Sequence, residues 1–285
     1  MKLKKVVFAS ILLCFLISCS SGKKKETAAS REKIILIATT SGNIKVKLYN
    51  ETPKHRDNFM KLVNQNFYDS LLFHRVIEKF MIQGGDPDSK KAKQGAVLGN
   101  GDVGYTIPAE FNRKFFHKRG ALAAARNGDD INPNKESSGC QFYIVHGRSY
   151  SDSLLKIQEG RVNGYIRQGI FGQIMDKPEN KTLKDNFTRY QAGKMWDSLK
   201  VLSAKMAPLV DAEVQKRGSE YHYNEEQRKA YTTVGGAPHL DGNYTVFGEV
   251  LEGMETVDKI AAAKRDPSDR PVDNIRILKM TVVKQ

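Results

Sequence analysis

Short β-like runs, separated by turns rich in glycine, constrain the fold of this chain more than any other feature. The first two runs, 33–40 and 43–49, flank Ser41-Gly42, and the second alternates apolar residues with lysines. This pattern predicts a β-hairpin with one buried face. Further β-like runs occupy residues 73–83, 104–107, 120–126, 141–146, 244–250 and 275–283. About eight short strands with turns between them indicate a mainly β sandwich or barrel.

Two amphipathic helices accompany the strands. Thr52-Pro53 supplies an N-cap residue and a proline at the first helical position. The helix that follows has one buried stripe, formed by Phe59, Leu62 and Val63, and ends near Asn66. The second helix has a stripe formed by Met254, Val257, Ile260 and Ala261.

The N-terminus has the pattern of an export signal. Three lysines precede a 12-residue apolar run, 6–17, which is shorter than the roughly 20 residues of a permanent membrane span. The run leads into LISC, residues 16–19, which resembles the bacterial lipobox. We therefore predict a lipoprotein signal peptide over residues 1–18, a lipidated Cys19, and a flexible tether over 19–32. An ordinary secretory signal with an incidental cysteine is the alternative.

Lipidation at Cys19 predicts where the protein lies. Acyl chains such as palmitate would anchor it to a bacterial membrane, because two or more chains suffice for stable attachment. The expected location is the cell envelope, on the periplasmic side or at the outer membrane of a Gram-negative cell. Cys140 is then the only thiol outside the signal and the anchor, so no intrachain disulfide is expected.

Charge and residue spacing argue against two classes of binding. The formal net charge is +14, but residues 1–33 hold eight Lys or Arg against two Asp or Glu, so +6 of it lies in this N-terminal stretch and the excess is partly that of the signal and tether. Elsewhere no basic cluster is interleaved with aromatic residues, and we predict no nucleic-acid partner. Cys and His do not occur at metal-ligand spacings, and we predict neither a metal nor a cofactor.

A different kind of sequence separates the β-like parts. Residues 151–234 are charged, contain the single tryptophan, Trp196, and show helical spacing at Leu199, Leu202 and Met206. We interpret them as a mostly helical insertion between two parts of one β domain, 33–150 and 235–285. The alternative, a single α+β core that includes these helices, stays open.

One segment raises a question of chemistry. Residues 73–86 read FHRVIEKFMIQGGD, in which a strand-like run carries Arg75. An unpaired charge in a core costs several kcal/mol or more, so Arg75 lies at a surface or in a site.

Three further motifs follow in order along the chain. They are GYTIPAEF at 104–111, RGALAAARNG with GCQFYIV at 119–128 and 139–145, and HLDGNYTVFGEVLEGMETVDKI at 239–260. Together with 73–86 they resemble the cyclophilins, a family of peptidyl-prolyl cis-trans isomerases. The resemblance covers roughly 33–150 and 235–285. It implies a closed eight-stranded antiparallel barrel capped by two helices, with the insertion added, and an isomerase (rotamase) that acts on unfolded or flexible proline-containing polypeptides.

The resemblance gives Arg75 a catalytic role. Rotation about an X-Pro bond meets a barrier of about 18–20 kcal/mol, because the amide is conjugated. A catalyst has to favour the twisted amide, whose nitrogen regains a lone pair. Arg75 would donate a hydrogen bond to that nitrogen, provided that the guanidinium is dry and fixed, and no covalent intermediate is needed.

The remaining site residues are carried over from the family by position. The implied substrate-binding set is His74, Phe80, Met81, Gln83, Ala125, Arg126, Gln141, Tyr143, His239, Leu240 and Tyr244. Phe80, Met81, Tyr143 and Leu240 would form the apolar pocket, although as isolated residues the first two could be core. His74 lies at the pocket edge without transferring a proton. His239 stands where many members have Trp, so we expect weak cyclosporin binding.

Two functions fit the sequence. The first is an isomerase that assists the folding of exported proteins in the bacterial cell envelope. The second is a non-catalytic envelope scaffold or holdase chaperone that acts through the helical insertion.

Overall fold

The computed structural model describes residues 32–283, so the predictions for the signal peptide and for Cys19 lie outside the described residues. The strands are β1 Lys33–Thr39, β2 Gly42–Leu48, β3 Phe73–Ile77, β4 Met81–Gly84, β5 Thr106–Ile107, β6 Ala121–Ala124, β7 Ser137–Ser138, β8 Phe142–Val145, β9 Val246–Glu252 and β10 Ile277–Val283. The α-helices are α1 Pro53–Asn64, α2 Asp152–Met175, α3 Lys181–Ala192, α4 Trp196–Arg217, α5 Glu225–Thr233 and α6 Met254–Ala261. Short 3-10 turns are η1 Pro87–Lys91, η2 Pro178–Asn180 and η3 Pro238–Leu240.

The mainly β architecture is confirmed, but the prediction of a closed barrel is wrong. Eight strands form one curled antiparallel sheet in the order β10-β1-β2-β9-β6-β8-β4-β3, so β3 and β10 are its two ends. Between these ends the described residues form no ladder but the isolated bridge Leu72–Arg276. The loop before β10 instead forms hydrogen bonds with the outer edge of β3. Phe73 N donates to Ile275 O, and Val76 N donates to Asp269 O. This loop satisfies backbone groups that an open edge would expose.

The run 73–83, expected as one β-like segment, is a tight hairpin. Strands β3 and β4 are joined by a turn in which Lys79 has a positive φ of 63° and Phe80 N donates to Ile77 O. The pairing register sets Arg75 opposite Gln83. The hairpin therefore brings together two polar residues that are eight positions apart in the sequence.

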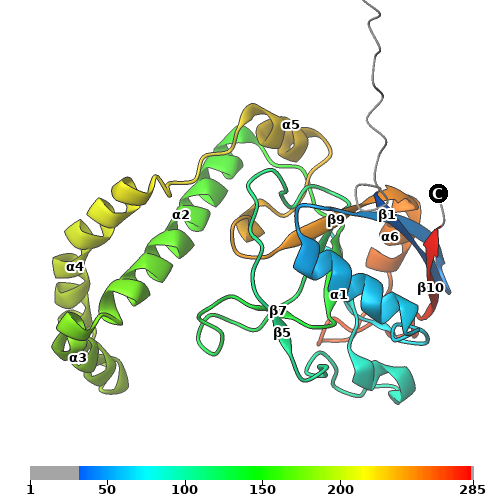
Figure 1. The fold of residues 1–285 in the computed structure, drawn as a ribbon, viewed down its shortest axis with the longest axis horizontal. Helices are drawn as coiled ribbons and strands as arrows, with labels where there is room; N and C mark the ends of the chain where they lie inside the picture. The colour runs from blue at the N-terminus through cyan, green and yellow to red at the C-terminus, as the bar shows by residue number, and fades with distance from the viewer. Residues whose placement is uncertain (1–31, 284–285) are drawn as a thin grey trace, which may run out of the picture. The chain divides into compact units, whose positions relative to one another are not determined.

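The main core lies between the curled sheet and the helices α1 and α6 (Figure 1). Strands β1 and β2 bury alternate residues, as predicted, including Ile35, Ile37 and Ile44. The predicted helix stripes are also buried. They comprise Phe59, Leu62 and Val63 from α1, and Val257, Ile260 and Ala261 from α6, whereas Met254 of the predicted second stripe is only half-buried against the same core.

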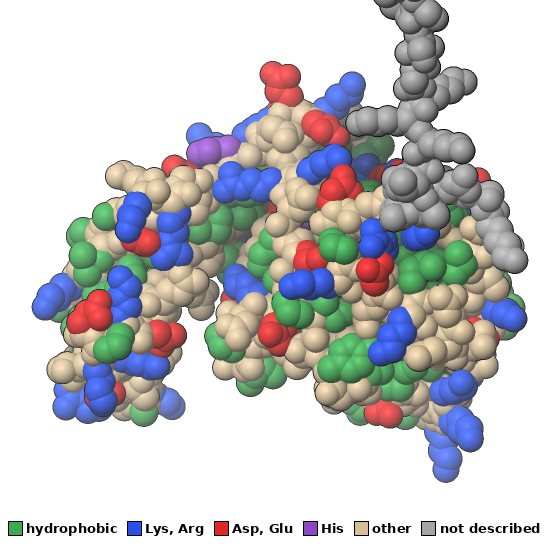
Figure 2. All heavy atoms as spheres, viewed as in Figure 1, with side chains coloured by type: hydrophobic (Ala, Val, Ile, Leu, Met, Phe, Trp, Pro, Cys, Tyr) green, Lys and Arg blue, Asp and Glu red, His purple; other side chains and the backbone are tan. Residues whose placement is uncertain are grey.

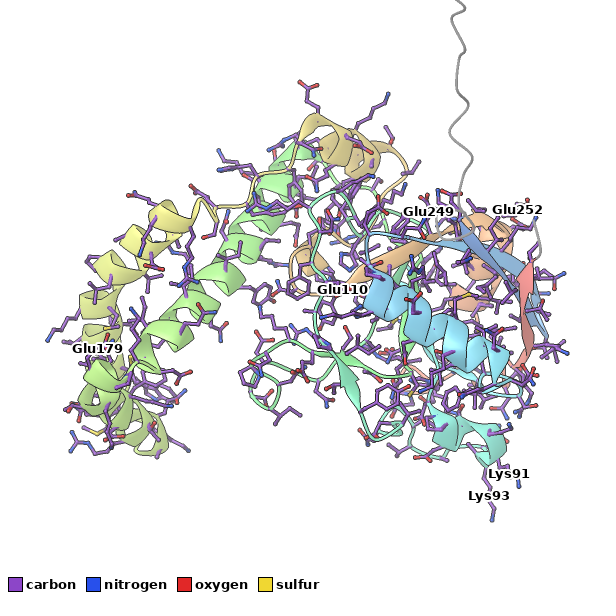
Figure 3. The ribbon with its side chains drawn as sticks, viewed as in Figure 1. Lys91, Lys93, Glu110, Glu179, Glu249 and Glu252 are labelled. Carbon is purple, nitrogen blue, oxygen red and sulfur yellow. The ribbon has the colours of Figure 1, made fainter. Side chains whose placement is uncertain are left out.

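The N-terminus of α1 is capped differently from the prediction. Thr52 occupies the N-cap position, but its hydroxyl donates to Tyr49 O at 3.4 Å and does not cap the helix. Glu110, from the 104–111 motif, lies at this helix end (Figure 3). Its two oxygens accept from Lys54 N and His55 N at 3.1 and 3.0 Å, and Oε2 also lies 2.7 Å from Nδ1 of His55. A carboxylate from a distant loop thus satisfies the free N–H groups at the positive end of the helix dipole.

The 151–234 segment is helical, as expected. Helices α2 and α4 run side by side, with α3 at one end (Figure 1). Their shared apolar cluster consists of Ile170, Ile174, Met175, Met206, Val210 and Val214. A second cluster joins the segment to the β part, because Leu155 and Tyr231 pack with Phe116. The segment therefore has its own core and also shares one with the β domain.

The outer surface of these helices is mixed in charge and also exposes apolar side chains such as Trp196 and Val201. Figure 2 shows Lys and Arg side chains among Asp and Glu over the helices α2 to α4. Lys181 pairs with Asp185, and Lys184 with Asp176. None of the helices between residues 32 and 283 combines the length and the apolar content that a membrane span needs.

Replacing Glu110 by alanine should lower the free energy of unfolding by about 1–2 kcal/mol, the usual effect of losing a helix cap. Glu110→Gln keeps one acceptor oxygen and should recover part of the loss. Glu51→Ala, which removes an exposed carboxylate near the same helix end, is the control and should cost about 0.5 kcal/mol or less. Denaturant titration measures all three, and equal stabilities for Glu110→Ala and Glu51→Ala would contradict the capping role.

Candidate active site

A cavity of about 290 Å³ lies against β3 and β4. Its walls comprise His74, Arg75, Phe80, Met81, Gln83, Leu98, Gly99, Asn100, Ala125, Arg126, Tyr143, Leu240, Tyr244 and Ser268. Most of the residues that the family resemblance predicted are therefore brought together in one hollow. Gln141 and His239 are the exceptions, since neither lines this cavity.

Side chains alternate between the two faces of the sheet, and this alternation places the site on the face opposite the core. Across β3, β4, β8 and β6 the pairing register aligns Val76, Ile82, Ile144 and Leu122 in one row, and each is fully buried in the main core. The neighbouring row consists of Arg75, Gln83, Tyr143 and Ala123. Successive side chains of a strand point to opposite faces, so this second row lies on the other side of the sheet. Met81 and Tyr143 belong to a separate apolar cluster there, with Phe80 packed against it, and not to the main core.

Arg75 lies at the end of this row with few fixed partners. Its Nη1 donates to Gln83 Oε1 at 3.4 Å, and its Nε lies 3.9 Å from Asp269 Oδ2. Both contacts are long, and a guanidinium has five N–H donors, so some remain for a ligand. The side chain is 43% exposed. The expectation of a dry guanidinium is therefore wrong for the free protein, because the cavity is open above it.

A series of hydrogen bonds through the side-chain amide of Gln141 holds Gln83 in place. Gln83 Nε2 donates to Gln141 Oε1 at 3.0 Å, and Gln141 Nε2 donates to the carbonyls of Gly99 and Gly101 at 2.9 and 2.8 Å. The buried carboxylate of Asp86 accepts from Gly99 N in the same loop. Gln141 thus does not line the cavity but holds the loop that does.

Leu98, Gly99, Asn100 and Ser268 line the cavity and were not predicted. The sequence signal for the first three is the glycine-rich run LGNG, residues 98–101, which indicates a tight loop but not its position. At Gly101 an added Cβ would come within 2.1 Å of Asp86 Oδ1, so the close approach requires glycine. Ser268 lies in the loop before β10 and carries no local signal.

Aromatic contacts fix the opposite wall. The Arg126 guanidinium lies 4.6 Å from the centre of the Tyr244 ring, and its Nε donates to Asn243 O at 2.8 Å. The His239 ring lies 5.4 Å from Phe80 and tilted by 34°, so it supports the apolar wall from outside the cavity. Weak cyclosporin binding, expected from His239, stays a prediction.

Burial keeps two histidines and one thiol near the cavity neutral at pH 7. Burial lowers the pKa of His74 to about 4, and neither ring nitrogen has a hydrogen-bond partner within residues 32–283. Burial, with the nearby His117, also lowers the pKa of His239 to about 4. Burial raises the pKa of the Cys140 thiol to about 11, so it is not a nucleophile at neutral pH. Across residues 32–283 no group of three His, Cys, Asp or Glu is arranged to hold a metal ion.

These features limit the chemistry of the site. The guanidiniums of Arg75 and Arg126 and the amide of Gln83 line the hollow together with apolar side chains, and none of the described lining residues is an activated base or a reactive nucleophile. Such a site can bind an apolar ring and donate hydrogen bonds, which suits a conformational reaction better than group transfer.

Comparison with known proteins gives a consistent result. The family model for "Cyclophilin type peptidyl-prolyl cis-trans isomerase/CLD" matches residues 34–194 and 217–282, which extends past residue 150 into the helical segment. A putative peptidyl-prolyl cis-trans isomerase of Staphylococcus aureus (strain USA300) is 28% identical over 254 residues, covering 89% of this chain and 92% of the relative. One of Staphylococcus saprophyticus is 27% identical over 250 residues, covering 87% of this chain and 91% of the relative.

A solved structure supports the fold. The crystal structure of a Cryptosporidium parvum cyclophilin type peptidyl-prolyl cis-trans isomerase aligns with a TM-score of 0.50 and 19% identity, covering 90% of this chain and 99% of that one. The resemblance found in the sequence is thus confirmed by the family match over most of the chain. The chain belongs to the cyclophilin-type peptidyl-prolyl cis-trans isomerase family.

Proposed function

We propose that the protein isomerises X-Pro bonds of unfolded or flexible exported polypeptides in the bacterial cell envelope, with Arg75 as the catalytic residue. One observation carries the proposal: the row that pairs Arg75 with Gln83 also contains Tyr143, the floor of an apolar pocket. A proline ring fits the chemistry of that pocket, and its amide nitrogen then faces the guanidinium.

The expected acceleration requires only a moderate reduction of the activation free energy of X-Pro rotation. Uncatalysed X-Pro rotation takes tens to hundreds of seconds, and an acceleration of about four decades corresponds to roughly 5.5 kcal/mol. A preorganised hydrogen-bond donor contributes up to about 4 kcal/mol. The remainder has to come from holding the proline ring in the pocket while the preceding carbonyl rotates.

A bound peptide would shield the Arg75 guanidinium from water. Arg75 is partly exposed, so water screens its charge in the absence of substrate. A peptide lying over the cavity excludes that water and strengthens the hydrogen bond to the twisted nitrogen. Only the twisted amide presents a lone pair, so the interaction favours the transition state over both planar isomers.

Replacing Arg75 by alanine should reduce kcat/KM for a proline tetrapeptide by about 10²- to 10³-fold, the usual effect of removing one preorganised donor. Arg75→Lys keeps the charge but not the planar fork, and should recover only part of the activity. Arg265→Ala is the matched control, because Arg265 also contacts Asp269 but does not line the cavity. A protease-free assay measures the rates; a wild-type rate equal to that of buffer, or full activity of Arg75→Ala, would refute the proposal.

The rate should be independent of pH from about pH 5.5 to 8, because His74 and His239 are already neutral there and no proton is transferred. Near pH 4 both rings take up protons, and the charge that His74 then carries near Arg75 should lower kcat/KM. The unfolded chain protonates these histidines near pH 6.5, so the free energy of unfolding also falls from about pH 6.5 to 4. Rates are therefore compared only where circular dichroism shows the fold intact, and a bell-shaped profile centred near pH 6.5 would indicate acid-base catalysis instead.

The envelope part of the proposal rests on the N-terminal sequence. A short apolar run after three lysines and a cysteine at its end support export and lipid attachment at Cys19. Lysines 23–25 directly after the anchor would be attracted to anionic headgroups, at about 1 kcal/mol each.

Replacing Cys19 by alanine should abolish the incorporation of labelled palmitate, because the acceptor sulfur is lost. Cys14→Ala, within the same apolar run, should keep the label and serves as the control. Autoradiography of the chain expressed in a bacterial host measures both. Label retained by Cys19→Ala would contradict the lipidation site and leave the isomerase proposal intact.

A further inference from the structure

A buried chain of hydrogen bonds links the helical segment to the proline pocket. Tyr221 and Tyr231 both donate to Asp241 Oδ2, at 3.1 and 2.6 Å. Asp241 Oδ1 accepts from His117 N at 2.9 Å and lies 2.8 Å from His117 Nδ1. His117 Nε2 lies 3.0 Å from the hydroxyl of Tyr143, which lines the pocket.

Burial and the chemistry of each group indicate which atom donates in each of these hydrogen bonds. His117 is 1% exposed, Asp241 3% and Tyr231 0%, so each polar atom needs a partner. A carboxylate only accepts hydrogen bonds, and therefore His117 Nδ1 carries a proton and donates it to Asp241. When the imidazole carries only this proton, Nε2 is the acceptor and the Tyr143 hydroxyl is the donor. Burial raises the pKa of Tyr143 and Tyr231 well above the usual value, which keeps both hydroxyls protonated.

The Tyr143 ring is also fixed from its sides. The ring of His117 stacks on it with centroids 6.1 Å apart and planes 13° apart. Tyr244, another wall of the pocket, meets it edge-on at 6.1 Å. These ring contacts and the hydroxyl bond to His117 together hold the Tyr143 ring in the pocket wall.

The tyrosine hydroxyls are not required to attach the helices. Apolar packing of Phe116 with Leu155 and the Tyr231 ring already joins the helical segment to the β domain. Replacing the hydroxyls by hydrogen keeps these rings and their burial. The bonds to Asp241 thus have a separate effect, which is to orient its carboxylate.

We propose that His117 and Asp241 are positioning residues for the isomerase reaction, and that Tyr221 and Tyr231 of the helical segment set the position of Tyr143 through them. The inference rests on the proposed function, because it assigns the segment a role in shaping the proline pocket. The helical segment then acts on the same reaction as Arg75 without touching the substrate.

A double-mutant cycle in the full chain tests the link. One arm is Tyr221→Phe with Tyr231→Phe, the other is Tyr143→Phe, and kcat and KM for the tetrapeptide are measured for each arm and for the combination. Coupled sites behave non-additively. We expect the double tyrosine substitution to lower kcat/KM about five-fold when Tyr143 is present, and less than about two-fold in the Tyr143→Phe background. Equal effects in both backgrounds would overturn the inference.

Controls separate this outcome from a loss of fold. Tyr150→Phe removes a hydroxyl from the same cluster but not from the hydrogen-bonded chain, and should leave kcat/KM unchanged. Should the double substitution unfold the protein, Tyr231→Phe alone replaces it in the cycle, because its bond to Asp241 is the shorter.

A second readout does not depend on turnover. In selectively labelled protein, the ring resonances of Tyr143 should shift on Tyr221→Phe with Tyr231→Phe and stay unchanged on Tyr150→Phe. Unshifted Tyr143 resonances would overturn the inference even in an active enzyme. An inactive wild type would instead refute the proposed function, while the resonance test still decides whether the segment positions Tyr143.

Discussion

The alternation of side chains across four paired strands is the constraint on which the rest of the structure depends. Val76, Ile82, Ile144 and Leu122 form a row that is wholly buried in the core, and this row fixes the register. A slip of one residue would expose the entire row to water. The neighbouring row, which holds Arg75, Gln83 and Tyr143, is therefore positioned by the hydrophobic burial of its own strand neighbours. The packing of the core therefore fixes the positions of the site residues, although these residues lie outside the core.

Buried carboxylate-histidine pairs hold the loops around this frame. Glu110 binds His55 and the start of α1, and Asp241 binds His117 and two tyrosines of the helical segment. In both pairs the carboxylate also accepts from a backbone N–H, which offsets the cost of burying it. Losing a capping carboxylate such as Glu110 costs about 1–2 kcal/mol, so these contacts help to tie the loops and helices to the sheet. The helical segment is consequently not a simple appendage, since its removal would leave Asp241 and Phe116 uncovered.

Much of the fold and most of the site residues followed from sequence patterns and from the family resemblance. The alternating strands and the helix stripes were predictable because burial follows a local period. The Glu110 cap, the 98–101 loop and Ser268 were not, since each depends on a contact with a distant part of the chain. The closed barrel was wrong because the loop before β10, rather than β10 itself, covers β3. The dry Arg75 was wrong because residue type gives no measure of how open a cavity is.

The sequence by itself determined which residue types the site has available: a guanidinium, two amides, apolar rings and no metal-binding spacing. It also determined the strand and helix periods, which depend on neighbours within a few residues. Only the tertiary structure decided that Gln141 acts behind Gln83, that His239 supports Phe80 from outside, and that two tyrosines of the helical segment reach Asp241. The physical reason is that hydrogen bonds and burial between distant segments depend on how the strands pair and the helices pack, and no local pattern encodes that arrangement.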